Sequence, residues 1–263
     1  MKILIKGAGD LATGIGFRLF QAGYTVWMTD LPVPTAVRRK VSFSSCIYEE
    51  QITIEDVTAV FAKDFEDAQK IQKDNKIPIF ADPAAHICKE YEPDIIVDAI
   101  MAKRNMGTTI MDAGLVIGIG PGFFAGKDCH YVIETKRGHY LGKVIKKGSA
   151  IPNTGIPGDV GGYTIERLIR SAGDGTFEPV AAIGDMVKKD QVVAFVSGKP
   201  IKANMSGLIR GMLQKGVTVR NGMKAGDIDA RCEVEHCCTI SDKARSIGGG
   251  VLEAVCAYEH SIV

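Results

Sequence analysis

The stretch Met1-Lys-Ile-Leu-Ile-Lys-Gly7-Ala-Gly9-Asp10-Leu-Ala12 decides the fold at the start of the chain. Its apolar residues predict a buried strand, and the glycines that follow predict a tight turn into a helix. Gly7 permits the turn, Gly9 lets the backbone approach a phosphate group, and Ala12 lets the helix pack closely on the strand. Together with Asp10, which opens the helix, these positions are the first candidates for binding a pyrophosphate.

The next segments continue the same pattern. The sequence predicts a helix from Asp10 to about Gln21 and a second strand from Tyr24 to Thr29, which ends at Asp30. Asp30 lies about 20 residues beyond the glycines, where an acidic side chain meets ribose hydroxyls in a dinucleotide site. This order of elements predicts a Rossmann-like α/β domain. The alternative is a doubly wound domain that kept the turn and binds nothing.

Composition excludes several other classes of protein. The 263 residues are 46% hydrophobic and 24% charged, which is typical of a globular chain with one large core or two smaller ones. A net charge of +1 gives no support to nucleic acid or an anionic membrane as a partner. No apolar run reaches the roughly 18 to 20 residues of a membrane span, so a cytoplasmic protein is expected. The seven cysteines form no C-x-x-C pair, so reduced thiols and no metal site are expected.

The chain changes character near residue 107. Residues 1–107 alternate strands with helices and are expected to form the Rossmann-like nucleotide-binding domain. Residues 108–263 are dense in glycine with short apolar segments, which predicts a β-rich domain interrupted by a helix over Gly162–Ala172. Two domains are therefore expected.

Part of this β-rich region contains an internal repeat. Residues 182–194 and 214–229 share a turn, a β-branched residue and a second turn before an apolar strand. The region over about 176–230 resembles the biotinyl and lipoyl carrier domains, or the barrel-sandwich hybrid modules that share their architecture. Lys199 is the candidate for a carrier lysine near the hairpin tip, but its neighbours depart from the carrier motif. No carrier-type lysine modification is expected.

Polar and glycine-rich segments supply further site candidates. Lys103, Arg104 and Asn105 follow the predicted strand Ile95–Ile100, where open α/β sheets have their ligand crevice. Gly120 and Gly122 belong to a run of flexible backbone whose N–H groups could form an anion nest. The alternative for this run is an ordinary glycine-rich turn.

Two more clusters carry reactive side chains. Residues 134–142 bring together an acid, two cations and a histidine, of which Arg137 and His139 are candidates for binding an anion or moving a proton; the alternative is a solvated hairpin. Residues 232–238 contain His236 and three cysteines, which could hold a soft metal or selenide. Buried, inert cysteine is the interpretation favoured here.

Seven motifs, taken as a set, resemble the YqeB family, the accessory proteins of bacterial selenium-dependent molybdenum hydroxylases. These motifs are Gly7-Ala-Gly-Asp-Leu-Ala-Thr-Gly14, Pro34-Thr-Ala-Val-Arg-Arg39, Asp98-Ala-Ile-Met-Ala-Lys-Arg-Asn105, Gly118-Ile-Gly-Pro-Gly-Phe123, Glu134-Thr-Lys-Arg-Gly-His139, Pro152-Asn-Thr-Gly-Ile-Pro-Gly158 and Ile247-Gly-Gly-Gly-Val-Leu-Glu253. The resemblance implies a maturation role: helping to deliver or assemble a selenium-containing molybdenum cofactor for xanthine-dehydrogenase-like enzymes. It supplies no catalytic residues.

Three hypotheses follow. The first is a maturation factor, more plausibly non-catalytic, that binds molybdopterin dinucleotide, with its pyrophosphate at the Gly7 to Ala12 turn and its pterin end near Lys103, Arg104, Arg137 or His139. The second is an NAD(P)-dependent oxidoreductase, because Asp30 suits an unphosphorylated ribose. The third is an assembly scaffold with a vestigial nucleotide turn. The expected partners are the client hydroxylase and other maturation factors, with no nucleic acid and no membrane, and self-association is left open.

Overall fold

The computed structural model describes residues 1–262 and divides into two compact units. The first unit contains residues 1–34, residues 42–154 and the C-terminal segment from Ile240. The second unit contains Thr35–Val41 and Gly155–Thr239. The chain therefore passes from one unit to the other four times.

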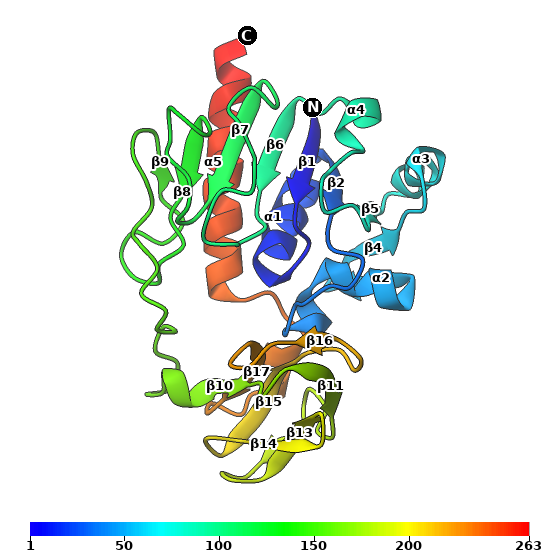
Figure 1. Cartoon of the computed structure of the whole chain (residues 1–263). Helices are drawn as coiled ribbons and strands as arrows, with labels where there is room; N and C mark the ends of the chain where they lie inside the picture. The colour runs from blue at the N-terminus through cyan, green and yellow to red at the C-terminus, as the bar shows by residue number, and fades with distance from the viewer. Residues whose placement is uncertain (263) are drawn as a thin grey trace. The chain divides into compact units, whose positions relative to one another are not determined.

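The first unit is built on a nine-stranded sheet with the order β3-β4-β5-β2-β1-β6-β7-β8-β9 (Figure 1). The strands from β4 to β8 in this order run parallel to their neighbours, whereas β3 and β9 are antiparallel edge strands. The strands are β1 (Lys2–Lys6), β2 (Thr25–Thr29), β3 (Gln51–Ile54), β4 (Val57–Phe61), β5 (Ile77–Phe80), β6 (Ile95–Asp98), β7 (Leu115–Ile119), β8 (Tyr131–Ile133) and β9 (Val144–Ile145).

Two long helices pack against each other on one face of this sheet (Figure 1). Helix α1 (Asp10–Gln21) buries Ala12, Ile15 and Leu19, which repeat at helical spacing along one side. Helix α5 (Asp242–Ile262) approaches α1 closely, since a Cβ placed on Gly248 would lie 2.6 Å from the Gly14 carbonyl oxygen. Glycine at this contact lets the two backbones meet.

The other face is covered by shorter helices. Leu4, Trp27 and Ile96 of the sheet share a buried cluster with Ile71 of α3 and Tyr91 of α4. The Trp27 and Tyr91 rings stack with their centroids 4.0 Å apart. Helices α3 (Phe65–Lys73) and α4 (Cys88–Tyr91) supply this cover. The first unit also contains η2 (Phe43–Ser45) and the short helix α2 (Cys46–Glu49).

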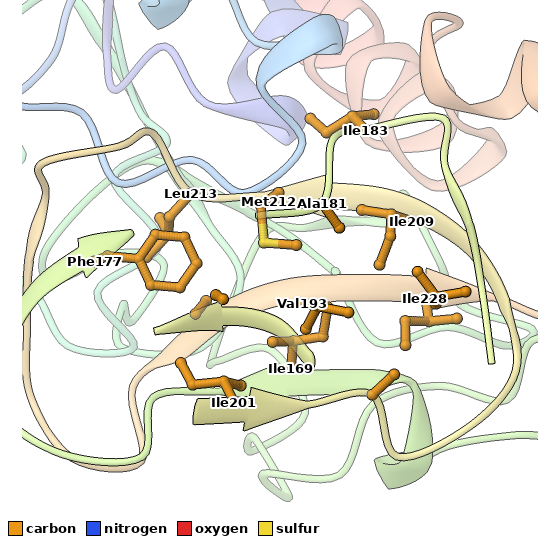
Figure 2. Packing of buried hydrophobic residues seen from close by; sticks show 14 of the residues in the cluster. Ile169, Phe177, Ala181, Ile183, Val193, Ile201, Ile209, Met212, Leu213 and Ile228 are labelled. Carbon is orange, nitrogen blue, oxygen red and sulfur yellow. The ribbon is translucent and has the colours of Figure 1, made fainter. Parts of the chain in front are cut away.

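The second unit consists of two four-stranded antiparallel sheets, β10-β17-β15-β12 and β14-β13-β11-β16. Side chains from both sheets, including Ile169, Phe177 and Ile228, form one buried cluster (Figure 2). The elements are η1 (Arg39–Val41), η3 (Ile165–Arg167), β10 (Leu168–Arg170), β11 (Gly175–Pro179), β12 (Met186–Val187), β13 (Val192–Val196), β14 (Lys199–Lys202), β15 (Gly207–Met212), β16 (Thr218–Val219), β17 (Lys224–Asp229) and η4 (Val234–Cys237). The early segment 35–41 is built into this unit, where the Met212 N–H donates to the Val37 carbonyl.

The predicted fold class, a Rossmann-like domain followed by a β-rich region with a biotinyl/lipoyl-like barrel-sandwich module, is wrong. The structure has instead one large mixed sheet and a pair of antiparallel sheets. Strands β7, β8 and β9, which lie beyond residue 107, complete the sheet that begins with β1, and the chain leaves the first unit for the β-rich second unit after residue 154 and returns at residue 240. The density of glycine after residue 107 obscured a continuous apolar run, Leu115–Ile119, which is typical of a buried parallel strand.

The predictions of individual helices were partly correct, although the predicted fold class was wrong. The helix predicted from Asp10 to Gln21 is confirmed as α1. The helix predicted over Gly162–Ala172 is wrong, because that segment forms η3 and β10. Of the helices in residues 1–262, none combines the length and the apolar character that crossing a membrane requires.

Candidate functional site

The topology of the nine-stranded sheet indicates where a ligand would bind. Strand β1 is central, and the chain leaves it toward β2 on one side and reaches β6 on the other. In open α/β sheets, loops diverge at such a switch point and leave a crevice beyond the carboxyl ends of the strands. We name the segments that follow these ends the carboxyl-edge loops; they are residues 7–10 after β1, 30–34 after β2, 99–112 after β6, 120–126 after β7 and 134–142 after β8.

Gly7 makes the first of these loops possible. Its φ of +98° lies in the region that favours glycine, and a Cβ at this position would lie 2.8 Å from the Ala99 carbonyl oxygen. Its N–H donates to the Thr29 carbonyl. The turn after β1 is thus pressed against the loop that follows β6, and only glycine fits there.

Asp30 supports the same turn. One of its carboxylate oxygens accepts the Ala8 N–H at 2.7 Å and the other accepts the Leu31 N–H at 2.7 Å. Burial raises the pKa of this carboxyl, and the two backbone donors partly oppose that rise. The sequence predicted that Asp30 binds ribose hydroxyls; the structure places both of its oxygens on backbone N–H groups of the first unit.

The N-terminus of α1 follows Gly9. This residue is the N-cap, with φ −72° and ψ −176°, and being glycine it brings no side-chain oxygen of its own to cap the helix. The first intrahelical bond runs from the Thr13 N–H to the Gly9 carbonyl. Asp10 occupies the first turn and Ala12 is buried beneath it. The N–H groups of a first helical turn have no acceptor within the helix, so this end can receive an anion.

Asn105 organises the loop after β6. Its amide nitrogen donates to the Thr108 carbonyl at 2.7 Å, and its amide oxygen accepts the N–H groups of Gly107 and Thr108. The sequence predicted a ligand-binding side chain here. The structure gives Asn105 a role in shaping the backbone.

Lys6, which ends β1, is tied to the loop after β6 through polar side chains. Its ammonium donates to the Thr108 hydroxyl at 3.0 Å, and that hydroxyl donates to Asp98 at 2.6 Å. The ammonium also lies 3.4 Å from the carboxylate of Asp112. Burial alone would raise the pKa of Asp112, but hydrogen bonds from Thr109 and the Lys6 charge outweigh it and hold that pKa below its ordinary value.

Lys103 and Arg104 lie at the exposed part of this loop. The Arg104 backbone contacts the loop after β7, because a Cβ on Gly122 would lie 2.7 Å from the Arg104 Cα. A Cβ on Gly120 would lie 2.7 Å from the Thr135 hydroxyl, in the loop after β8. Both glycines have positive φ. They therefore serve as contact points between neighbouring carboxyl-edge loops.

The loop after β8 is arranged around Glu134. This buried carboxylate accepts the N–H groups of Thr135, Lys136 and Ile151. Arg137 pairs with Asp242 at the start of α5. His139 is exposed and meets the edge of the Tyr140 ring with centroids 4.9 Å apart.

The remaining candidates do not form a site in the described structure. Cys237 is buried with its thiol near the Ile209 carbonyl, and burial raises its pKa, whereas Cys238 is exposed. Lys199 is exposed at the start of β14. Within residues 1–262, no group of three His, Cys, Asp or Glu side chains is placed to hold a metal ion.

The carboxyl-edge loops thus bring together several predicted residues. Gly7, Gly9, Asp10 and Asp30 lie around the first turn, and the loop carrying Lys103 and Arg104 contacts both Gly7 and Gly122.

Sequence reasoning missed Lys6, Thr108 and the bonding of Asp98. The available signals were a lysine and an aspartate that end two otherwise apolar strands.

Comparison with other sequences identifies the family. The chain is 45% identical over 258 residues to uncharacterized protein YqeB of Escherichia coli strain K12, and the match covers 98% of this chain. The chain belongs to the YqeB family. It spans about half of that relative, 48% of its length. No family model matches the chain.

Solved structures resemble the chain only distantly. An aspartoacylase family protein of Mesorhizobium loti is 14% identical and has a TM-score of 0.25, with 56% of this chain and 60% of that chain covered. A succinylglutamate desuccinylase of a Silicibacter species is 13% identical and has a TM-score of 0.26, with 86% and 84% covered. TM-scores this low support no argument about activity.

Proposed function

We propose that this chain is a non-catalytic, cytoplasmic maturation factor that holds a dinucleotide at the carboxyl-edge loops. The observation that carries the proposal is glycine, a residue with no capping side chain, at the N-cap of α1. Glycine is about as good an N-cap as threonine, but it has no side-chain oxygen to occupy the first-turn N–H groups. A glycine there therefore leaves room for a phosphate to accept these groups.

The contrast between Gly7 and Gly9 supports this argument. Gly7 is required by its positive φ and by its contact with Ala99, so its presence says nothing about a ligand. Gly9 has φ −72° and ψ −176°, which residues with a side chain also adopt. Because the backbone conformation does not demand glycine at position 9, close approach of a ligand is the better reason for it.

The donor set suits a pyrophosphate. When bound, such a group supplies negatively charged oxygens, which accept hydrogen bonds from backbone N–H groups and attract cations. The N–H groups of the first turn of α1 would hold one phosphate, and Lys103 and Arg104 are exposed cations on the loop that contacts Gly7. The helix end contributes roughly 0.3 to 2 kcal/mol, whereas micromolar affinity needs about 8 kcal/mol. Most of the affinity must therefore come from the neighbouring loops.

The biological part of the proposal rests on the family resemblance. The YqeB-like motifs favour a role in maturing selenium-dependent molybdenum hydroxylases, with molybdopterin dinucleotide as the ligand. Since the chain spans 48% of its relative, the client enzyme and the other maturation factors belong to the proposal as well. Asp30 accepts backbone N–H groups with both oxygens, which weakens the argument for NAD(P).

Native mass spectrometry with elemental analysis tests this proposal. The protein is purified from a host that makes molybdenum cofactor, alongside Gly9→Asp and a charge-matched control, Gly249→Asp, at a helical glycine with open space around it. We expect a bound pterin dinucleotide in the wild type and the control but not in Gly9→Asp, because the new carboxylate caps the helix and repels phosphate. Retention of NAD alone would favour an oxidoreductase. An empty wild-type protein would favour a scaffold.

A further inference from the structure

The loop after β6, residues 99–112, has an exposed tip and is anchored by a small group of buried polar side chains, which we call the foot. The foot consists of Thr108 of the loop, which is 3% exposed, Asp98 at the end of β6, which is 2% exposed, and Lys6 at the end of β1, whose side chain is 14% exposed. The tip carries Lys103 and Arg104, both exposed. Burying polar groups costs free energy unless they are hydrogen-bonded, so the burial of these three side chains needs a structural or functional explanation.

The hydrogen bonds of the foot have a fixed direction. A threonine hydroxyl has one proton, and Thr108 gives it to Asp98 at 2.6 Å. The Lys6 ammonium must therefore be the donor to Thr108, at 3.0 Å. The ammonium therefore donates to the hydroxyl, and the hydroxyl donates to the carboxylate. These two hydrogen bonds connect the loop to the ends of β1 and β6, where Lys6 and Asp98 are register partners.

The tip is held in a conformation that its residues disfavour. Met101 has φ +62° and Lys103 has φ +63°, in the left-handed region that side chains rarely adopt. Ile100, Lys103 and Arg104 are exposed, and the Arg104 Nε donates to the Met106 thioether at 3.3 Å. The segment is anchored by Asp98, which accepts the Ile100 N–H and the Thr108 hydroxyl, and by Asn105, which accepts the N–H groups of Gly107 and Thr108. Strain that persists through such anchors clusters at functional sites.

The position of the tip relates it to the proposed nucleotide site. The Ala99 carbonyl lies close to Gly7 in the turn after β1, and the Arg104 backbone lies close to Gly122 in the loop after β7. The two cations at positions 103 and 104 thus belong to a segment fixed between the α1 turn and the loop after β7.

We propose that Lys6, Thr108 and Asp98 are positioning residues that hold Lys103 and Arg104 ready for the diphosphate group of a nucleotide. This inference rests on the proposed nucleotide site and assigns its cationic side. Pre-organising the tip lowers the entropy that binding would otherwise lose. The foot acts on the ligand through the tip and touches no phosphate itself.

Calorimetric titration with ADP, which carries a diphosphate, tests the assignment. Thr108→Val keeps the side-chain shape but removes the hydroxyl, and Thr108→Ser keeps the hydroxyl. We expect Thr108→Val to weaken ADP binding about tenfold, as loss of one well-placed charged contact does, and Thr108→Ser to bind like the wild type. Lys103→Ala should weaken binding to a similar extent. Lys73→Ala, at the end of α3, is the matched cation control and should change nothing.

A second readout separates positioning from folding. The dependence of ADP affinity on salt concentration should become shallower in Lys103→Ala and in Thr108→Val, because both lose an ordered cation at the ligand. A foot with a structural role alone would lower the unfolding temperature of Thr108→Val and leave its ADP affinity and salt dependence as in the wild type, which overturns the inference. If the wild type binds no ADP, the nucleotide site itself fails, and this inference fails with it.

Discussion

The two units of this protein use buried charge in different ways. In the second unit, Asp227 is paired with Arg167 at 3.0 Å and Asp229 with Arg231 at 2.6 Å, so each buried carboxylate is met by a guanidinium. In the first unit, the hydrogen bonds that link Lys6, Thr108 and Asp98 anchor a loop whose cations, Lys103 and Arg104, are exposed. Buried ion pairs such as those of the second unit stabilise the fold, whereas we infer that the buried groups of the first unit hold exposed cations in place for a ligand.

Removing a carboxylate from the second unit should have the largest effect. Asp227→Ala leaves Arg167, which is 6% exposed, without its carboxylate, and breaking such a pair costs about 3 to 5 kcal/mol. Urea unfolding followed by far-ultraviolet circular dichroism measures this loss. Glu178→Ala, at an exposed position on β11, is the control and should stay within about 0.5 kcal/mol of the wild type. Equal stability of both variants would show that the buried pair of Asp227 and Arg167 does not stabilise the second unit.

A methyl group at Gly7 should break the first unit. Gly7→Ala forces a side chain into φ +98° and to 2.8 Å from the Ala99 carbonyl oxygen, which we expect to cost about 3 kcal/mol. The fluorescence of Trp27, which is the one tryptophan and is buried in the first unit, reports the transition. Gly249→Ala, in open space, should leave the transition in place or raise it. A Gly7→Ala protein as stable as the wild type would show that the turn does not need glycine.

Acid should weaken the second unit through Asp229. Burial opposes ionisation of this carboxyl, but the hydrogen bonds and charge of Arg231 outweigh it and lower its pKa to about 2. A group whose folded pKa is depressed stabilises the fold above its unfolded value of about 3.9 and loses that contribution as the pH falls through its folded value. We expect about 2 kcal/mol of stability to disappear between about pH 4 and pH 2.

Asp229→Asn provides the comparison for this acid effect. The variant should be less stable at neutral pH and should show a flatter dependence on pH over the same interval, measured by urea unfolding at each pH. An unchanged slope would mean that other carboxylates carry the effect.

The smallest effect on stability is expected at the N-cap of α1. Gly9→Asp supplies a capping oxygen that glycine does not have, and we expect it to raise the free energy of unfolding by about 0.5 kcal/mol. Trp27 fluorescence in urea measures this change. Destabilisation would indicate that Gly9 serves the fold, and the argument that it serves a ligand would be lost.

Local elements were predictable from the sequence where one physical signal dominated. Helix α1 has apolar residues at helical spacing, Ala12, Ile15 and Leu19, which are buried. Its C-terminal end is marked by Gly23, which has a positive φ. Asp64 marks the start of α3, where its carboxylate accepts the Asp67 N–H.

The fold class was not predictable in the same way, because it depends on which segments pair across long stretches of chain. Leu115–Ile119 carries the apolar run of a central strand, but its partner β6 is identified only by the assembled sheet. The Gly-Gly-Gly run at positions 248–250 gave no local signal of a helix, because glycine disfavours helices. Within this run, Gly248 lies close to the Gly14 backbone of α1 and Gly250 lies close to the Gly142 backbone, whereas Gly249 has open space around it.

The candidate site was predictable in its glycines and less so in its side chains. Gly7 and Gly9 follow from spacing alone, whereas Asn105 and Arg137 turned out to bond within the first unit. Lys6 and Thr108 are 102 residues apart, and a hydrogen bond across that separation has no signature in either segment.

The return of α5 to the first unit has a consequence for synthesis on the ribosome. Residues 242–262 are made after the whole of residues 155–239, so the second unit emerges before the helix that packs on α1 exists. Until then, Gly14 and the side of α1 around it have no α5 against which to pack. The first unit therefore completes its packing only after the second unit has been synthesised, although its first strands are made earlier.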